Sequence, residues 1–315
     1  MTTAPLDRRG LLFGASAYLV WGLFPLLMHA LIPASALEIT AQRAIWSLGV
    51  CLVIVACVRG WSRLRMVLTN RRTLLTLALA AILIAANWLV YVYAVVTDQV
   101  ASASLGYYIN PLVTVALGVV VLGERLRRMQ LVAVGIAAIA VAVIGIEMGT
   151  LPWISLALAF SFGFYGLIKK RVGASVDAIT GLTVETLVLA PFALVALVWM
   201  SRAGTLTFAA RGSEGLGLHH DLLLVSAGIA TVGALLLFAA GAARLPLNIT
   251  GLLQYIAPTM MFMLAVWYFH EPMPAGRWIG FALVWVALVL ITVDSWRAWS
   301  KRSDPDAEPE FAETV

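Results

Sequence analysis

Two ionisable side chains lie well inside long apolar stretches of the sequence, and both are candidates for chemistry. A charge at the centre of a membrane-spanning helix costs about 2.5–3.5 kcal/mol on insertion scales, so each needs a reason. Glu185 lies near the middle of its stretch, roughly 14 Å from the inner end by the rise of a helix. Two interpretations stay open for it: a carboxyl that binds a proton or a coupling cation, or a hydrogen-bonded carboxyl between helices.

Arg43 lies in another apolar stretch, roughly 10 Å from its outer end. A planar guanidinium suits a substrate carboxylate. It also suits Glu185, which lies on the corresponding helix of the second half of the chain. A third interpretation is that the long side chain simply extends to the membrane interface.

Polar and aromatic side chains gather on further apolar stretches. Asn87 and Tyr91 share one face of a predicted helix, and in lipid such a stripe must face protein or water. Aromatic walls with a few polar groups suit an amphipathic small molecule; the alternative is interhelical packing and hydrogen bonding. The complete set of predicted substrate-binding residues is Arg43, Asn87, Trp88, Tyr91, Tyr107, Tyr108, Asn110, Glu185, Gln254 and Tyr255.

Several predicted membrane helices contain a proline. Proline lacks a backbone N–H and clashes with the carbonyl four residues earlier. Membrane helices tolerate it where neighbouring groups or water satisfy the freed carbonyl. We therefore expect hinge points at Pro25, Pro111 and Pro258.

The motifs of metal, nucleotide and hydrolase chemistry are missing from the sequence. Cys51 and Cys57 are about 9 Å apart along one predicted helix, too far for a disulfide, and no Cys–His cluster accompanies them. A Gly-rich phosphate loop, a His-Glu-x-x-His motif and a Gly-x-Ser-x-Gly motif are all lacking. We expect no catalytic residue, no cofactor and no metal site.

The elements that carry these residues are membrane helices. With 62% hydrophobic and 12% charged residues, a chain of 315 residues cannot bury its apolar side chains in a water-surrounded core. An all-α polytopic membrane protein is predicted, because a helix of about 20 residues crosses the hydrocarbon layer. The ten predicted transmembrane helices cover residues 11–32, 37–58, 74–96, 101–122, 129–146, 151–171, 176–200, 220–241, 248–268 and 277–295.

The basic residues predict the orientation of these helices. Most of the 21 Lys and Arg residues fall in alternate connections between the spans, and positive residues collect on the cytoplasmic side. Ten spans with both termini in the cytoplasm fit this pattern. The predicted location is the cytoplasmic (inner) membrane.

The sequence contains an internal repeat. Tyr255-Ile256-Ala257-Pro258 repeats Tyr108-Ile109-Asn110-Pro111, and Glu271 follows Pro258 at the same distance as Glu124 follows Pro111. Each half has five spans, an odd number, so the second copy enters the membrane from the opposite side. The predicted organisation is a cytoplasmic segment (1–10), two inverted five-helix repeats (11–146 and 151–295) and an acidic cytoplasmic tail (296–315).

Several segments resemble one family of transporters. They are Glu38 to Arg43 with Trp46-Ser47, Ser161 to Leu167 with its basic end, and Thr183-Val184-Glu185-Thr186. Over roughly residues 10–298 the chain resembles the RarD family of EamA-type permeases, in the drug/metabolite transporter superfamily. The resemblance implies an inner-membrane secondary carrier with two EamA repeats. The family's label, chloramphenicol-sensitive protein, hints at efflux without fixing a substrate.

Inverted repeats are typical of secondary transporters, which bind substrate near the midplane between the halves. The leading prediction is therefore a permease that moves a small metabolite or drug-like compound by alternating access. Its expected partners are a small-molecule substrate and the lipid bilayer, with protons as a candidate coupling ion and no nucleic acid. The alternatives are a receptor or assembly subunit without transport, and an intramembrane enzyme acting on lipids.

Overall fold

The computed structural model describes residues 7–122, 127–172, 176–210 and 216–302. This part of the chain is helical and contains no β-strand, so the all-α prediction is confirmed. Glu124 and the predicted tail beyond residue 302 lie outside it. The elements are α1 (Arg8–His29), α2 (Ala36–Cys57), α3 (Trp61–Thr69), α4 (Arg71–Val96), α5 (Val100–Leu122), α6 (Arg128–Met148), α7 (Trp153–Val172), α8 (Ala178–Ala203), α9 (Gly217–Ala242), α10 (Leu247–Leu253), α11 (Ile256–Met263), the π-helix η1 (Leu264–Tyr268) and α12 (Ala275–Arg302).

Within the described ranges, nine helical stretches are long and apolar enough to cross a membrane. They coincide with nine of the ten predicted spans. The remaining predicted span, 151–171, forms α7, a helix of 20 residues whose last turn contains Lys169, Lys170 and Arg171. A multi-pass membrane protein is thus confirmed, and the count of ten stays a prediction. At the C-terminal end, α12 continues to Arg302, beyond the predicted boundary at residue 295.

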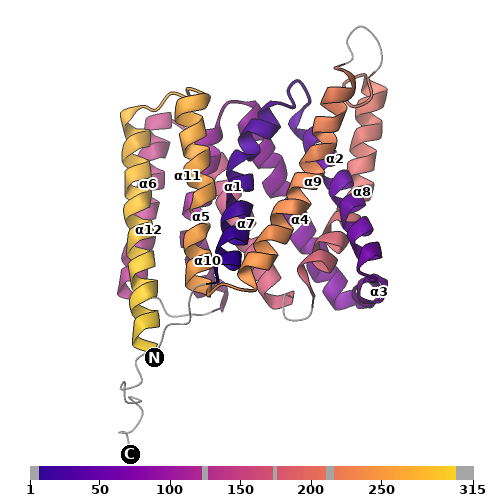
Figure 1. Ribbon diagram of the computed structural model, residues 1–315. Helices are drawn as coiled ribbons and strands as arrows, with labels where there is room; N and C mark the ends of the chain where they lie inside the picture. Colours follow the sequence, from indigo (N-terminus) through magenta and orange to yellow (C-terminus); the bar gives the residue numbers. More distant parts are fainter. Residues whose placement is uncertain (1–6, 123–126, 173–175, 211–215, 303–315) are drawn as a thin grey trace, which may run out of the picture.

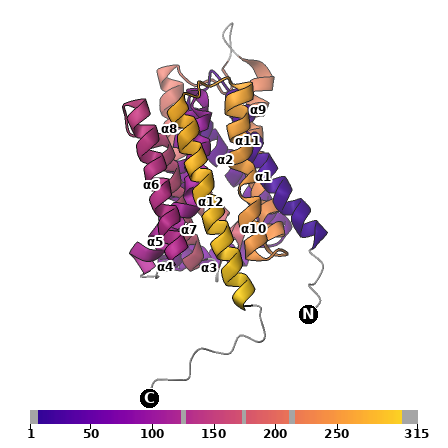
Figure 2. The ribbon, with the colours of Figure 1, turned by 90° about the vertical axis from the view of Figure 1, so that its left-hand side faces the viewer.

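The helix contacts repeat with the two halves of the chain exchanged. α1 packs against α9 and α11, and α7 makes the corresponding contacts with α4 and α5. α2 packs against α9, and α8 makes the corresponding contact with α4. Corresponding helices also pair with each other: α2 with α8, α5 with α11 and α6 with α12. α6 and α12 form one edge of the bundle, and α8 with α3 forms the other (Figure 1). α1 begins and α12 ends at the same end of the bundle (Figure 2).

Contacts at one end of the bundle fix the direction of the helices. His29, the last residue of α1, lies 4.0 Å from Asp98, which follows α4. The rings of Tyr93 near the end of α4 and Trp153 at the start of α7 are 5.6 Å apart. α1 and α4 therefore end where α7 begins, so the first helix of the second half runs opposite to the first helix of the chain.

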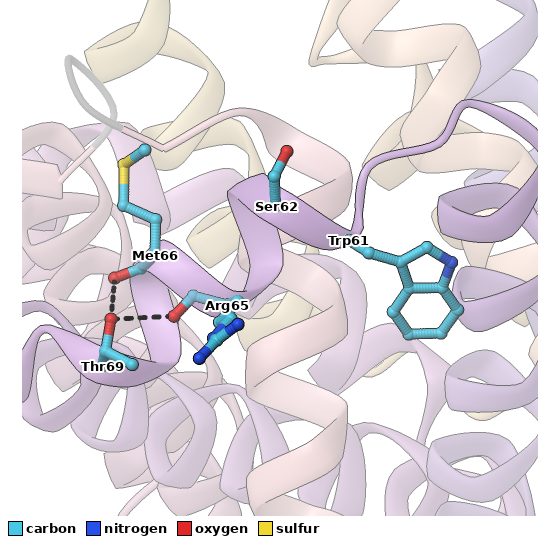
Figure 3. A pocket seen from close by; sticks show the side chains of 5 residues that line it. All are labelled: Trp61, Ser62, Arg65, Met66 and Thr69. Atoms are coloured by element: carbon cyan, nitrogen blue, oxygen red, sulfur yellow. Dashed lines mark hydrogen bonds between the residues drawn. The ribbon is translucent and has the colours of Figure 1, made fainter.

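The basic connection after α2 contains a short helix that the sequence did not predict. α3 is amphipathic: Leu64 and Val67 are buried, whereas Met66 is exposed. A depression of about 450 Å³ is lined by Trp61, Ser62, Arg65, Met66 and Thr69 (Figure 3). All its lining residues belong to α3, so it is a surface groove of one helix and not a chamber between the halves.

The predicted ninth span is interrupted in the structure. Instead of one helix over 248–268, the chain forms α10, α11 and η1, with a break at Gln254 and Tyr255. Pro258 explains the break, because it cannot donate to the carbonyl of Gln254 four residues earlier. By contrast, α1 continues through Pro25 and α5 through Pro111. The hinge roles of these three prolines stay predictions.

Asp177→Ala is expected to lower the free energy of unfolding by about 1 kcal/mol at neutral pH, because Asp177 caps the start of α8. Its carboxylate accepts hydrogen bonds from the N–H and hydroxyl of Thr180, at 2.9 and 2.7 Å. Partial burial acts to raise the pKa of Asp177, but these hydrogen bonds and the charge of Arg63 outweigh it, so the pKa lies below its ordinary value.

A carboxyl with a lowered folded-state pKa stabilises the fold above its unfolded value of about 3.9, and this contribution is lost as the pH falls through the folded pKa. Denaturant titrations should therefore give a lower free energy of unfolding for Asp177→Ala than for wild type at neutral pH. The two free energies should become equal at about pH 2. Asp177→Asn keeps a capping oxygen and serves as the control. If the difference in the free energy of unfolding between wild type and Asp177→Ala were as large in acid as at neutral pH, the prediction would be wrong.

Candidate functional site

The helix that carries Arg43 is held at its start by a buried carboxylate. Ser35 caps α2 by accepting a hydrogen bond from the Glu38 N–H at 3.2 Å. The fully buried Glu38 carboxylate in turn accepts hydrogen bonds from the N–H groups of Thr207 and Phe208, at 2.9 and 2.8 Å, in the segment after α8. Arg43 follows little more than one helical turn later, so these contacts fix its position.

The Arg43 guanidinium is buried among α1, α2, α4 and α9, with 4% of the residue exposed. Its Nε donates to the Thr231 hydroxyl on α9 at 2.7 Å. Its Cζ lies 4.2 Å from the ring centroid of Trp88 on α4 and 5.1 Å from that of Phe24 on α1. Nη1 is buried without a hydrogen-bond partner, and no ion pair within the described ranges includes Arg43. The Arg43 charge is therefore stabilised by contacts with two aromatic rings and with the Thr231 hydroxyl, and it lacks a counterion.

Close contact between α2 and α9 brings Thr231 to Arg43. Gly228 lies one helical turn before Thr231, and a Cβ at this position would come within 2.7 Å of the Ser47 backbone nitrogen. The Ser47 hydroxyl donates to the Gly228 carbonyl at 3.3 Å. Any larger residue would separate the two helices and weaken the contact with Arg43.

α4 presents three of the predicted residues to the interior. Asn87, Trp88 and Tyr91 are each less than a tenth exposed. Tyr91 lies three residues after Trp88 and four after Asn87, so its side chain neighbours both on the helix surface. The Asn87 amide donates to the Leu158 carbonyl at 3.1 Å and to the Ser161 hydroxyl at 3.0 Å, both on α7. The Tyr91 hydroxyl, by contrast, is buried without a partner. Asn87 therefore connects helices, whereas Tyr91 is left with an unused donor.

Tyr107 joins this group from α5. Its hydroxyl donates to the Asn87 side-chain oxygen at 3.1 Å, and its ring lies 6.0 Å from that of Tyr91. Gly106 permits this placement, since a Cβ there would lie 2.8 Å from the Ser155 carbonyl oxygen on α7. Tyr91 in turn lies three residues after Trp88 on α4, and the Trp88 ring contacts Arg43. The structure thus brings together five of the predicted site residues: Arg43, Asn87, Trp88, Tyr91 and Tyr107.

The other predicted residues lie elsewhere. The Tyr108 hydroxyl is 2.7 Å from that of Thr259 on α11, and its ring contacts Phe281 and Trp285 on α12. Tyr108 therefore packs between α5 and the last helices, because adjacent residues of a helix point about 100° apart. Asn110 donates to the Ala159 carbonyl at 3.5 Å and accepts from the Thr114 hydroxyl at 3.3 Å. Gln254 and Tyr255 lie at the break between α10 and α11.

Glu185 has a different partner from the one considered in the sequence. Lys169 on α7 donates to its Oε1 at 2.7 Å, and the Tyr165 hydroxyl donates to its Oε2 at 3.1 Å. The ion pair is asymmetric, with side-chain exposures of 29% for Lys169 and 1% for Glu185. The interpretation of Arg43 as the partner of Glu185 is thus wrong, since Lys169 and Tyr165 already occupy both carboxylate oxygens.

Arg43 and Glu185 nevertheless occupy equivalent positions. Each is the eighth residue of its helix, α2 or α8, and these two helices pack against each other. Arg43 contacts Phe24 on the first helix of its half, and Glu185 contacts Tyr165 on the first helix of the other half. Glu185 is paired with Lys169, whereas Arg43 has no ion-pair partner among the described residues. The two residues therefore have equivalent positions but different chemical environments.

Sequence reasoning missed the residues that complete both sites. Lys169 was assigned to the inner boundary of its span, yet it lies four residues after Tyr165 and shares that residue's helix face. That spacing was a usable signal. Thr231 and Phe24 gave none, because single hydroxyl and aromatic residues are common in membrane helices. Within the described ranges, no group of three or more His, Cys, Asp or Glu side chains is placed to hold a metal ion.

Comparisons with known proteins show the family. The EamA-like transporter family matches the sequence twice, over residues 8–146 and 151–293. The chain is 49% identical to Protein RarD of Streptomyces exfoliatus over 291 residues, which cover 92% of this chain and 90% of that protein. It is 43% identical to the uncharacterized transporter YojE of Bacillus subtilis (strain 168), with coverages of 93% and 97%.

Protein RarD of Escherichia coli (strain K12) is 41% identical over 93% of this chain and 96% of its own. A solved crystal structure shares the fold with a TM-score of 0.57 at 20% identity, covering 90% of this chain and 97% of the other. The two family matches together account for nearly the whole sequence. The chain therefore belongs to the EamA-like transporter family and resembles, over most of its length, the relatives named RarD.

Proposed function

We propose that this protein is a secondary active transporter that moves a small metabolite or drug-like compound across the cytoplasmic membrane by alternating access. Relatives covering almost the same length are named transporters, which supports a membrane permease in general. We further propose ten membrane crossings, arranged as inverted repeats at residues 11–146 and 151–295, with both termini in the cytoplasm. The exchanged helix contacts and the opposite directions of α1 and α7 support this arrangement.

The observation that carries the proposal is the buried, incompletely bonded Arg43 where the two halves meet. Its contacts come from α1 and α4 of the first half and from α9 of the second. A buried charge without a counterion lowers stability unless a ligand completes it. An arrangement that retains such a charge in a membrane interior is typical of a substrate site.

The contact pattern supports alternating access. If the halves are equivalent, each packing of one half against the other has a counterpart with their roles exchanged, and the two open the site to opposite sides of the membrane. Glu185, which is paired with Lys169 of α7, lies at the position in α8 that Arg43 occupies in α2. We propose protons as the coupling ion, with Glu185 as the group that exchanges them.

Reconstitution into proteoliposomes tests the proposal. A panel of radiolabelled aromatic acids, their neutral amides and aromatic amines is offered with and without an imposed pH gradient. Protein-dependent, saturable flux of at least one compound is expected, with protein-free liposomes as the control for leakage. Binding without flux would favour a receptor, and chemical turnover of added lipid without flux would favour an enzyme; either result contradicts the proposal.

A further inference from the structure

We propose that Arg43 and Tyr91 form a subsite for the carboxylate of a small aromatic monoanion. This inference rests on the proposed function, because it names the class of substrate that the transporter would carry. It comes from two unused donors, Nη1 of Arg43 and the hydroxyl of Tyr91, each buried without a hydrogen-bond partner. The Arg43 guanidinium lies against Trp88, which is three residues before Tyr91 on α4. Arg43 and Tyr91 are 4% and 2% exposed, on the facing helices α2 and α4.

The number and kind of the donors favour a carboxylate. One cationic donor and one hydroxyl match the two oxygens of a single carboxylate, and hydrogen bonds to a charged acceptor are about twice as strong as neutral ones. Asn87 and Tyr107 do not compete for the ligand, since they bond each other and α7. A dianionic phosphate would leave one negative charge uncompensated, because the site supplies only one cation.

The charge of the site excludes cationic substrates. Within the described ranges, Arg43 is the ionised group of this cluster, and no carboxylate is paired with it. Glu185 cannot serve a substrate ammonium while Lys169 and Tyr165 hold both its oxygens. The positive charge of Arg43 would thus attract a substrate carboxylate and repel a protonated amine.

Aromatic rings near Arg43 and Tyr91 indicate that the rest of the substrate is aromatic. Phe24 and Trp88 lie against the guanidinium, and Tyr107 lies beside Tyr91. Phe162 follows, with its ring 6.1 Å from that of Tyr107. The rings of Tyr91, Tyr107 and Phe162 thus contact one another in sequence. A flat aromatic body packs against such rings in offset or edge-to-face geometry.

Ligand binding to the purified full-length protein in detergent tests the inference without requiring flux. Benzoate is the probe, benzamide is the uncharged compound of the same shape, and benzylammonium is the cation. Calorimetric titration at neutral pH is expected to show benzoate binding about tenfold or more tighter than benzamide, and no detectable binding of benzylammonium. Equal affinity for the acid and the amide, or absence of benzoate binding, would overturn the inference.

Variants assign the effect to the two donors. Arg43→Gln should abolish the preference for benzoate over benzamide. Tyr91→Phe should weaken benzoate binding a few-fold without lowering the melting temperature of the unliganded protein, because its hydroxyl has no partner to lose. Arg127→Gln is the matched control: it removes a positive charge already paired with Asp294 at 3.2 Å, and the preference should persist. Should Arg43→Gln fail to fold, Tyr91→Phe decides, and unchanged benzoate affinity there overturns the inference.

The two proposals fail in different ways. Benzoate binding that depends on Arg43, without flux of any compound in proteoliposomes, would leave the carboxylate subsite standing and remove the transport function. Flux that is equal for acids, amides and amines would support transport and overturn the carboxylate subsite.

Discussion

Replacing Lys169 by methionine is expected to lower the free energy of unfolding by about 3 kcal/mol, because Glu185 would remain in the protein interior without its counterion. The Glu185 side chain is only 1% exposed, so water cannot replace the lost ammonium. Breaking a buried ion pair by removing one partner costs about 3–5 kcal/mol, and the lower end applies because Lys169 is itself 29% exposed. Denaturation of the detergent-solubilised protein with SDS, followed by circular dichroism, measures the loss.

Lys170→Met is the matched control. Lys170 is adjacent in sequence but exposed, so its replacement should change the stability by less than about 0.5 kcal/mol. The double variant Lys169→Met with Glu185→Leu should recover most of the loss, since no unpaired charge is left behind. If Lys169→Met proved as stable as Lys170→Met, the ion pair would be structurally unimportant.

The fold was largely predictable because membrane helices are read from long apolar stretches. The repeat around Pro111 and Pro258 predicted a two-part architecture, and the family match shows two copies. What hydropathy could not predict was the amphipathic α3, whose basic residues were assigned to a connection. Nor did it predict the break at Gln254, although the position of Pro258 four residues later accounts for it.

The sequence predicted which site residues share a face of one helix better than it predicted which helices those residues contact. The spacing of Asn87 and Tyr91 predicted one shared helix face, and both residues are buried, as is Trp88. Tyr107 and Tyr108 are neighbours in sequence and were both assigned to the site, yet they face different helices. Such a separation depends on the rotation of α5 about its axis, which packing against α7 and α11 determines.

Arg43 and Glu185 show why position alone does not give a residue its role. Both are buried at the same place in corresponding helices. Glu185 is satisfied within the protein, whereas Arg43 keeps an unused donor. Removing a paired charge and removing an unpaired one should therefore change stability in opposite directions.

Arg43→Met is accordingly expected to lower flux in proteoliposomes by about 10- to 100-fold while the unliganded protein becomes more stable by about 1 kcal/mol. The loss of flux corresponds to one charge-assisted hydrogen bond to the substrate, about 1.5–3 kcal/mol. The gain in stability arises because desolvation of an unpaired ion costs several kcal/mol. The lost contacts, two cation–π interactions and the hydrogen bond to Thr231, together contribute about 3 kcal/mol and offset most of that cost.

The two measurements for Arg43→Met have to be made on the same preparation. SDS denaturation gives the stability, and initial rates of substrate entry give the flux. Thr231 retains its own hydrogen bond to the Ala227 carbonyl at 2.7 Å, so no second polar group is left unsatisfied by the change. A variant that was less stable and still transported would show that Arg43 serves the fold. A variant that was more stable and transported less would show that Arg43 binds the ligand and lowers the stability of the unliganded protein.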